Sequence, residues 1–128
     1  MTHSKSKLLS IFFDQWEAFF DELIRCFPGD VDFPRLKSYL RIGRAVNPKR
    51  VVTAVQKHMF PFENLVRSKN ADFFLKYPFS EYDGKEDIQY VIQKVKALWF
   101  ELSPNNQSVV LDYVIILVDL LHRYLAMP

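Results

Sequence analysis

Apolar side chains recur at intervals of three and four residues along most of this chain, and that spacing places them on one face of an α-helix. The clearest run has steps of four, three, four and four, in the order Phe12, Trp16, Phe19, Leu23, Phe27. Only three of the 128 residues are Gly, fewer than a turn-rich all-β chain would need. The pattern therefore predicts an all-α protein.

Pairs of a capping residue and a proline mark helix starts, because the cap side chain accepts a hydrogen bond in the first turn and Pro has no N–H to lose there. Asn47-Pro48 and Ser103-Pro104 are such pairs, and Asp83 with Glu86 forms a capping box. The expected helices are Lys5–Cys26, Pro34–Ala45 with Asp32 or Phe33 as its cap, a helix from Pro48 to about Met59, short helices at 62–68 and 71–77, 83–102, and Pro104–Ala126.

The length and short loops predict one compact domain over residues 1–128, a bundle of five to seven helices, with a flexible tail at 1–6. The last helix is apolar on nearly every side between Val109 and Leu121, which favours a place at the centre of the bundle. The residues expected in the core are Val114, Ile115, Leu117 and Leu121, packed near Phe12, Trp16, Phe19, Leu23, Val95 and Trp99.

Several classes of protein do not fit the composition. Cys26 is the only cysteine, which excludes an internal disulfide and a cysteine-based zinc site. The apolar run before Asp14 is short and is followed by no small-residue cleavage site, so a signal sequence is not expected. Asp112 and Asp119 interrupt the most apolar stretch, so a membrane span is not expected either. A soluble intracellular protein is the simplest interpretation.

No pattern of catalytic residues is visible. His3, His58 and His122 are isolated, whereas a metal or general-base site needs convergent ligands or an orienting partner. A phosphate-binding glycine loop, a nucleophile elbow and a zinc-binding helix motif are all absent from the sequence. We therefore expect a protein that is not an enzyme, with no cofactor and no metal.

The segment from Phe33 to Phe62 is the most unusual part of the chain in charge. It contains seven Lys or Arg residues and no Asp or Glu, and because the whole chain carries +2, the remainder carries −5. Such asymmetry suggests a patch that steers a charged partner. The residues expected to contact nucleic acid or an acidic protein are Lys37, Arg41, Arg44, Lys49, Arg50 and Lys57.

Three interpretations of this basic segment remain open. The helices joined at 45–47 have the connection length of a helix-turn-helix, whose second helix would present Arg50, Thr53, Gln56 and Lys57 to base edges. A patch that binds phosphates or an acidic partner without sequence preference is the second interpretation. The third is an ordinary solvated face of two helices.

An acidic stripe with helical spacing lies on the first helix, at Asp14, Glu17 and Asp21. A carboxylate-bridged metal site in a helical bundle would add a Glu-x-x-His pair, which the sequence lacks. The stripe is either a solvated face or a surface for a basic partner or a second copy. A homodimer is also expected, because the last helix is widely apolar and Phe13, Phe60, Phe62 and Phe79 are candidates for exposed aromatic side chains.

Three stretches of residues carry a resemblance to a known group: FFDELIRCFPGDVDFP, NPKRVV and NADFFL. Over roughly residues 12–76 the chain resembles small orphan proteins of nucleocytoplasmic large DNA viruses, including the marseillevirus group. The resemblance implies a small all-α viral protein in the host cytoplasm or viral factory, with the virion or nucleus as alternatives. It carries over no active-site residue.

These observations together predict a non-enzymatic viral binding protein that acts through the basic segment. Its partner would be nucleic acid or an acidic protein, and no small-molecule substrate or membrane is expected. The alternative is a structural virion protein or oligomeric scaffold that does not bind nucleic acid.

Overall fold

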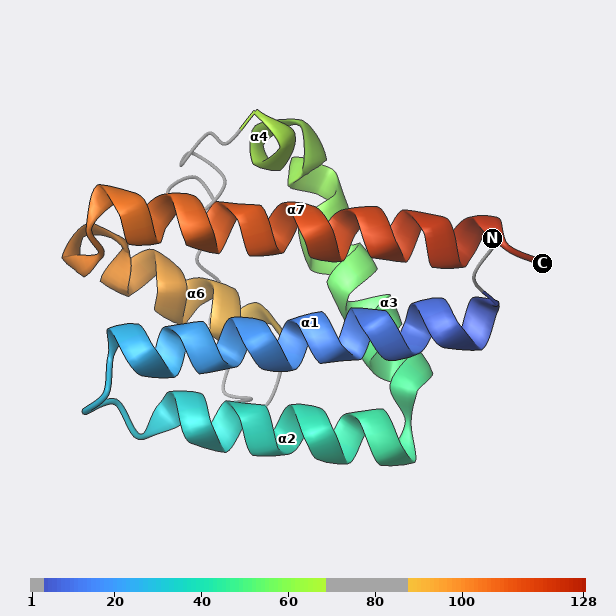
Figure 1. Ribbon diagram of the computed structural model, residues 1–128, viewed down its shortest axis with the longest axis horizontal. Coiled ribbons are helices and arrows are strands. Elements are labelled where there is room, and N and C mark those ends of the chain that lie inside the picture. The colour runs from blue at the N-terminus through green and yellow to red at the C-terminus, as the bar shows by residue number, and fades with distance from the viewer. Residues whose placement is uncertain (1–3, 69–87) are drawn as a thin grey trace.

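The computed structural model describes residues 4–68 and 88–128, and all regular elements in those two ranges are helices (Figure 1). The predicted all-α bundle of five to seven helices is confirmed by six α-helices within the described residues. In chain order the elements are α1 (Lys5–Cys26), α2 (Asp32–Val46), α3 (Pro48–Met59), the 3₁₀ turn η1 (Phe60–Phe62), α4 (Glu63–Arg67), α6 (Ile88–Leu98), the 3₁₀ turn η2 (Trp99–Glu101) and α7 (Pro104–Ala126).

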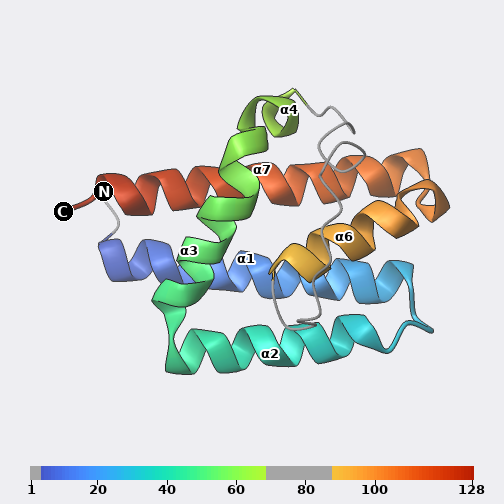
Figure 2. The same ribbon diagram turned by 180° about the vertical axis from the view of Figure 1, so that it is seen from behind.

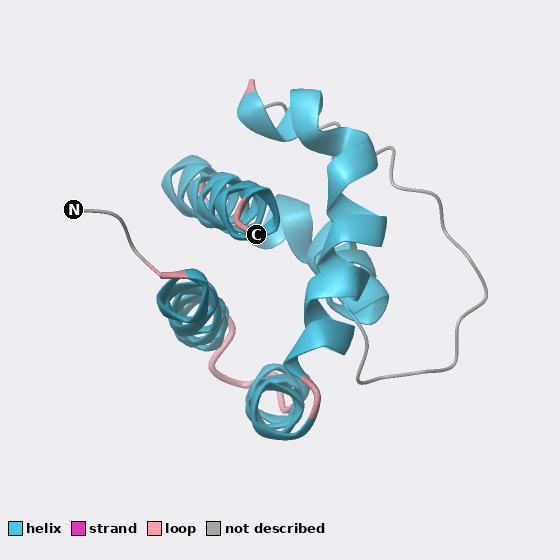
Figure 3. Cartoon of the chain, turned by 90° about the vertical axis from the view of Figure 1, so that its right-hand side faces the viewer, coloured by secondary structure: helices cyan, strands magenta, loops and turns pink. Residues whose placement is uncertain are grey.

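Three long helices lie side by side as one layer, with α1 between α2 and α7 and antiparallel to both (Figures 1 and 3). Helices α3 and α6 pack together on one face of this layer, where α3 crosses over α1 and α7 (Figure 2). Among the described helices, the most extensive contact joins α1 to α7, followed by the contact between α1 and α2. Helix α1 is therefore the element against which the layer assembles.

The helix starts follow the local capping signals where those exist. The Asn47 side chain accepts a hydrogen bond from Arg50 N at 3.3 Å, and Ser103 Oγ accepts one from Asn106 N at 3.1 Å, as the sequence predicts. The cap predicted for α2 at Asp32 or Phe33 is wrong. The helix begins at Asp32 itself, after Val31, because Asp30 Oδ1 accepts a hydrogen bond from Asp32 N at 2.9 Å and orders the turn earlier.

Other predicted boundaries differ by a few residues. Helix α1 begins at Lys5 after a Ser4 cap, so two residues of the predicted tail are helical. The helix predicted at 62–68 is divided into η1 and α4, and the last turn of the helix predicted at 83–102 is η2. The helix predicted at 71–77 and the capping box of Asp83 and Glu86 lie outside the described residues.

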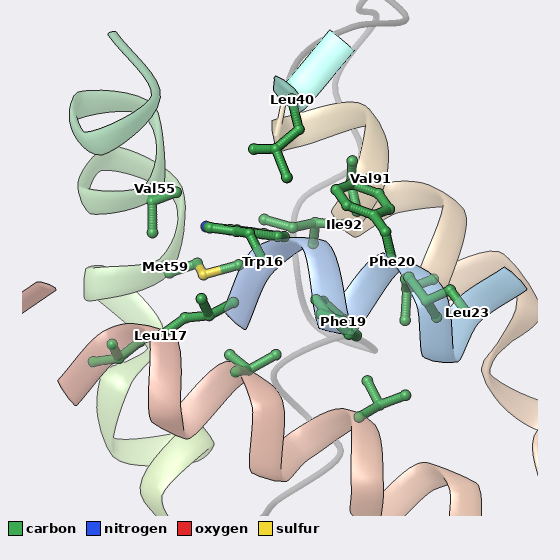
Figure 4. Close-up of a cluster of buried hydrophobic side chains, with 14 of the residues drawn as sticks. Trp16, Phe19, Phe20, Leu23, Leu40, Val55, Met59, Val91, Ile92 and Leu117 are labelled. Carbon is green, nitrogen blue, oxygen red and sulfur yellow. The ribbon is translucent and has the colours of Figure 1, made fainter. Parts of the chain in front are cut away.

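The core forms where the apolar face of α1 meets α3, α6 and α7 (Figure 4). All the predicted core positions are buried except Ile115, which is half-buried. Trp16 packs against the rings of Phe19 and Phe20, at centroid distances of 5.7 and 5.8 Å. Its indole N–H has no hydrogen-bond partner within the described residues. An orphaned donor costs about 1–3 kcal/mol, so Trp16 stabilises the core through its packing and not through its polar atom.

The predicted central position of α7 is not confirmed. Its inner side is buried, but Ile116 on its outer side is 39% exposed, and Leu125 beside its C-terminal end is 41% exposed. Phe13 was predicted as an exposed aromatic, and this prediction is wrong, because the ring is 1% exposed under α2. The Arg44 guanidinium lies 5.5 Å above it. Phe60 is half-buried, while Phe79 and the side chain of Phe62 lie outside the described residues.

Two adjacent positions on α7 test the packing of the core. Leu117 is 0% exposed and Ile116 is 39% exposed, so truncation of each to Ala removes similar atoms from different environments. Leu117→Ala is expected to lower the free energy of unfolding by about 2–5 kcal/mol, through lost burial and the cavity left behind. Ile116→Ala should cost well under half as much. Urea denaturation followed by circular dichroism measures both, and equal losses would contradict this packing.

Candidate cationic interface on α3

The acidic stripe of α1 faces the basic residues of α2. Lys37 Nζ lies 2.7 Å from Asp21 Oδ1, and Arg41 Nε lies 3.5 Å from Glu17 Oε1. Arg44 contacts the other end of the stripe through Asp14 and Glu17. The acidic residues of α1 and the basic residues of α2 each recur at helical spacing, and the two helices are antiparallel. Their opposite charges therefore meet one after another along the α1–α2 contact. We call these six residues the α1–α2 ion-pair row.

Arg44 has the densest set of contacts in this row. Its Nη1 donates to Asp14 Oδ1 at 2.9 Å and to Glu17 Oε2 at 2.7 Å. Its Nη2 donates to the Ser10 carbonyl and hydroxyl oxygens, both at 3.2 Å. Burial would lower the pKa of Arg44, but the hydrogen bonds to the two carboxylates outweigh it and raise the pKa. Arg44 is thus a charged link between α1 and α2.

Helix α3 follows α2 after a single residue, Asn47, and Gly43 in the last turns of α2 lies close to α3. A Cβ at Gly43 would lie only 3.1 Å from Val51 Cγ2, so a small residue lets the last turn of α2 approach α3 closely. Val52, Val55 and Met59 then bury one side of α3 against the bundle. The opposite side of α3 is left facing outward.

That outward side carries the remaining predicted cations. Lys49, Arg50 and Lys57 are exposed, and no described residue forms an ion pair or hydrogen bond with their charged groups. Thr53 lies among them and donates its hydroxyl to the Lys49 carbonyl at 2.9 Å. We call Lys49, Arg50 and Lys57 the cationic face of α3. An open depression of about 370 Å³ on this surface is lined by Asn47, Lys49, Arg50, Thr53, Ala54, Lys57 and His58.

The six cations predicted as one binding patch therefore divide into two groups. Lys37, Arg41 and Arg44 are engaged by the carboxylates of α1, while the cationic face of α3 is available to an external anion. The predicted acidic stripe is likewise engaged from within the chain. Exposed ion pairs contribute little energy each and exchange with water, so the row mainly cancels charge between α1 and α2.

A charged cluster that was not predicted from the sequence lies where the α1–α2 loop meets α6. Lys94 Nζ lies 2.8 Å from Asp30 Oδ2 and 3.0 Å from Asp32 Oδ2, and the Tyr90 hydroxyl donates to Asp32 at 3.0 Å. The hydrogen bond from Lys94 lowers the pKa of Asp32. Burial and then the hydrogen bond to Asp32 raise the pKa of Tyr90. The only sequence signal was that Lys94 stands at the edge of the apolar face, four residues before Leu98.

A second missed cluster holds the far end of α3 in place. The Phe60 and His122 rings stack with centroids 4.4 Å apart, and His122 Nε2 hydrogen-bonds to the Glu63 carboxylate. Arg67 lies 2.7 Å from Asp119 on α7. Because α3 continues through η1 into α4 without a loop, these contacts fix the direction in which α3 crosses the bundle.

Comparisons with known proteins do not place the chain in a family. No protein family matches the chain, and neither curated proteins nor solved structures gave a match. In residues 4–68 and 88–128, none of the helices has the length and apolarity that crossing a membrane requires. The same residues contain no group of three or more His, Cys, Asp or Glu side chains placed to hold a metal ion.

The link formed by Arg44 predicts a measurable stability effect. Arg44→Ala leaves Asp14 without an ion-pair partner among the described residues and Glu17 with Arg41 alone. It should lower the free energy of unfolding by about 2 kcal/mol, within the usual range for hydrogen bonds to charged groups. Lys49→Ala is the matched control, since no described residue pairs with Lys49, and its effect should stay within about 0.5 kcal/mol. Equal effects in urea denaturation would show that Arg44 is not a structural link.

The Asp32 cluster predicts a dependence of stability on pH. Because the folded protein lowers the pKa of Asp32, its contribution is fully present above the unfolded pKa of about 3.9 and is lost as pH falls through the folded value. Asp32→Asn should therefore have a lower free energy of unfolding than the parent at pH 7. This difference in free energy should narrow below about pH 4. Urea denaturation across this range measures the difference.

The exposed Glu101 gives the control, as Glu101→Gln removes an acidic charge that has no ion-pair partner within the described residues. The opposite result is that the free energies of unfolding of Asp32→Asn and the parent differ by the same amount from pH 7 to below about pH 4. That result would contradict a pH-dependent contribution of Asp32 to stability.

Proposed function

We propose that this protein is a non-enzymatic binding protein that holds the phosphate backbone of a nucleic acid on the cationic face of α3. One observation carries the proposal. Three exposed cations share one side of a short helix without partners among the described residues, while the neighbouring cations of α2 are paired with α1. Lys and Arg side chains in such an arrangement are typical phosphate ligands.

The geometry of α3 supports phosphate binding over an incidental solvated face. An ordinary solvated face mixes both signs of charge, as α1 and α2 do together. The outward side of α3 has no Asp or Glu from Pro48 to Met59, and the depression beside it is lined by amide, hydroxyl and basic groups together with apolar surface that includes Ala54. A polyanion can approach this surface without displacing an internal carboxylate.

A structural scaffold is the second candidate. Ile42 and Val46 lie four residues apart on α2 and are 58% and 78% exposed, and this exposed apolar pair supports association with another copy or with a shell of neighbours. A protein that forms a dimer in light scattering and binds no nucleic acid would fit this candidate better.

The setting of the proposed function rests on the resemblance described above. Similarity to small orphan proteins of large DNA viruses supports action in the host cytoplasm or a viral factory, with packaging in the virion as the alternative. Either setting offers nucleic acid as a ligand for a protein with a cationic helix. The proposed chemistry of α3 does not depend on which setting is correct.

Removal of two cations from α3 tests the proposed function directly. Lys49→Gln/Lys57→Gln should weaken binding to a labelled DNA fragment by roughly tenfold per cation at about 50 mM salt, because each phosphate contact releases a bound counterion. The slope of log affinity against log salt should become shallower by about 0.9 per cation. Fluorescence anisotropy at several salt concentrations measures both quantities.

Two controls separate the site from general charge. Lys7→Gln/Arg123→Gln removes the same charge at exposed positions of α1 and α7. Arg41→Gln removes a cation of the α1–α2 ion-pair row. Both variants should bind almost as the parent does. The proposal fails if the parent shows no affinity at low salt, or if the controls weaken binding as much as the α3 variant.

A further inference from the structure

Helix α3 is exposed along its length on the side that carries the cations. In Figure 2 it crosses over α1 and α7 on the outside of the layer, and its buried residues Val52, Val55 and Met59 belong to the core cluster. An α-helix with side chains is about 10–12 Å wide, and the major groove of B-form DNA is about 12 Å wide. A helix carried on the outside of a bundle in this way can enter such a groove.

The spacing of the cations fits a double helix. Lys49 and Lys57 are eight residues apart, which is about 12 Å along the helix axis. Each DNA strand places one phosphate about every 3.4 Å along the duplex axis, so two cations about 12 Å apart can contact different phosphates. Around the helix, at about 100° per residue, Thr53 lies between Lys49 on one side and Arg50 and Lys57 on the other. A small residue thus has long cationic side chains on both sides.

The described part of the α3 surface has few of the groups that hold single strands. Proteins that bind single-stranded nucleic acid stack its bases on aromatic side chains. No Phe, Tyr or Trp is among the described residues that line the depression on α3. The exposed aromatic Phe100 belongs to η2, on the connection between α6 and α7. Among the described lining residues, only the imidazole ring of His58 could stack on a base.

We infer that the ligand is B-form duplex DNA, with α3 seated in its major groove and Lys49, Arg50 and Lys57 on backbone phosphates. The inference rests on the proposed function and deepens it by naming the class of nucleic acid. Duplex RNA is disfavoured, since its A-form major groove is deep and narrow and side chains cannot read it. Because the contacts are to phosphates, affinity should depend little on base sequence.

The experiment compares four labelled ligands of equal length at about 50 mM salt, where phosphate contacts contribute strongly. These are a DNA duplex, one of its strands, an RNA duplex of the same sequence and a DNA duplex of scrambled sequence. The two DNA duplexes should bind alike, and at least about tenfold more tightly than the strand or the RNA. A dye that occupies the major groove should displace the protein, whereas a minor-groove ligand should not.

The outcomes separate this inference from the proposed function. If the single strand or the RNA duplex binds as tightly as the DNA duplex, and Lys49→Gln/Lys57→Gln still weakens it, the duplex assignment is overturned and phosphate binding by α3 stands. If only the minor-groove ligand displaces the protein, the major-groove placement is wrong. If none of the four ligands binds, both are overturned.

Discussion

Helix α1 lies between α2 and α7, and the rest of the structure depends on how its residues divide between these neighbours. Its apolar face is rich in aromatic side chains and meets α7, α3 and α6, while its carboxylates meet α2. The seven buried residues of α1 are Leu8, Phe12, Phe13, Trp16, Phe19, Phe20 and Leu23. Full burial of one such side chain contributes about 1.5–3 kcal/mol, against about 0–1 kcal/mol for an exposed ion pair. Packing therefore supplies most of the stability.

The ion pairs have a different consequence, which is the distribution of charge over the surface. The basic segment would form a broad positive patch if α2 faced solvent with all its cations free. Because α1 places Asp14, Glu17 and Asp21 against α2, the cations of the basic segment that have no ion-pair partner among the described residues lie on α3. The contacts of Phe60 and Glu63 with His122 then hold α3 in its crossing position. A surface for a polyanion thus follows from how the core orients two helices.

Features of the fold that depend on neighbours in sequence were predictable. The caps at Asn47 and Ser103 act within one turn of their helices, so a short stretch of sequence determines them. The inner faces of α1 and α7 follow from the helical repeat alone. Phe13 was misjudged because it lies beside the main apolar stripe, and its burial depends on α2 and on the position of Arg44 above it.

The candidate site was predictable only in part. The sequence showed that Lys49, Arg50 and Lys57 share one side of a helix, because that depends on spacing alone. It could not show that the cations of α2 meet the acidic stripe of α1, because the direction in which α2 turns its charged side is set by packing between distant residues. The contact of Lys94 with Asp30 and Asp32 is hidden for the same reason, since it joins α6 to the loop before α2.

The central claim is that the α1–α2 ion-pair row directs an external polyanion to α3, and backbone amide NMR during titration with duplex DNA tests it most directly. The account predicts that the largest chemical-shift changes fall between Asn47 and His58, with small changes at Asp14, Glu17 and Arg44. Changes centred on Lys37, Arg41 and Arg44, with α3 unaffected, would contradict it.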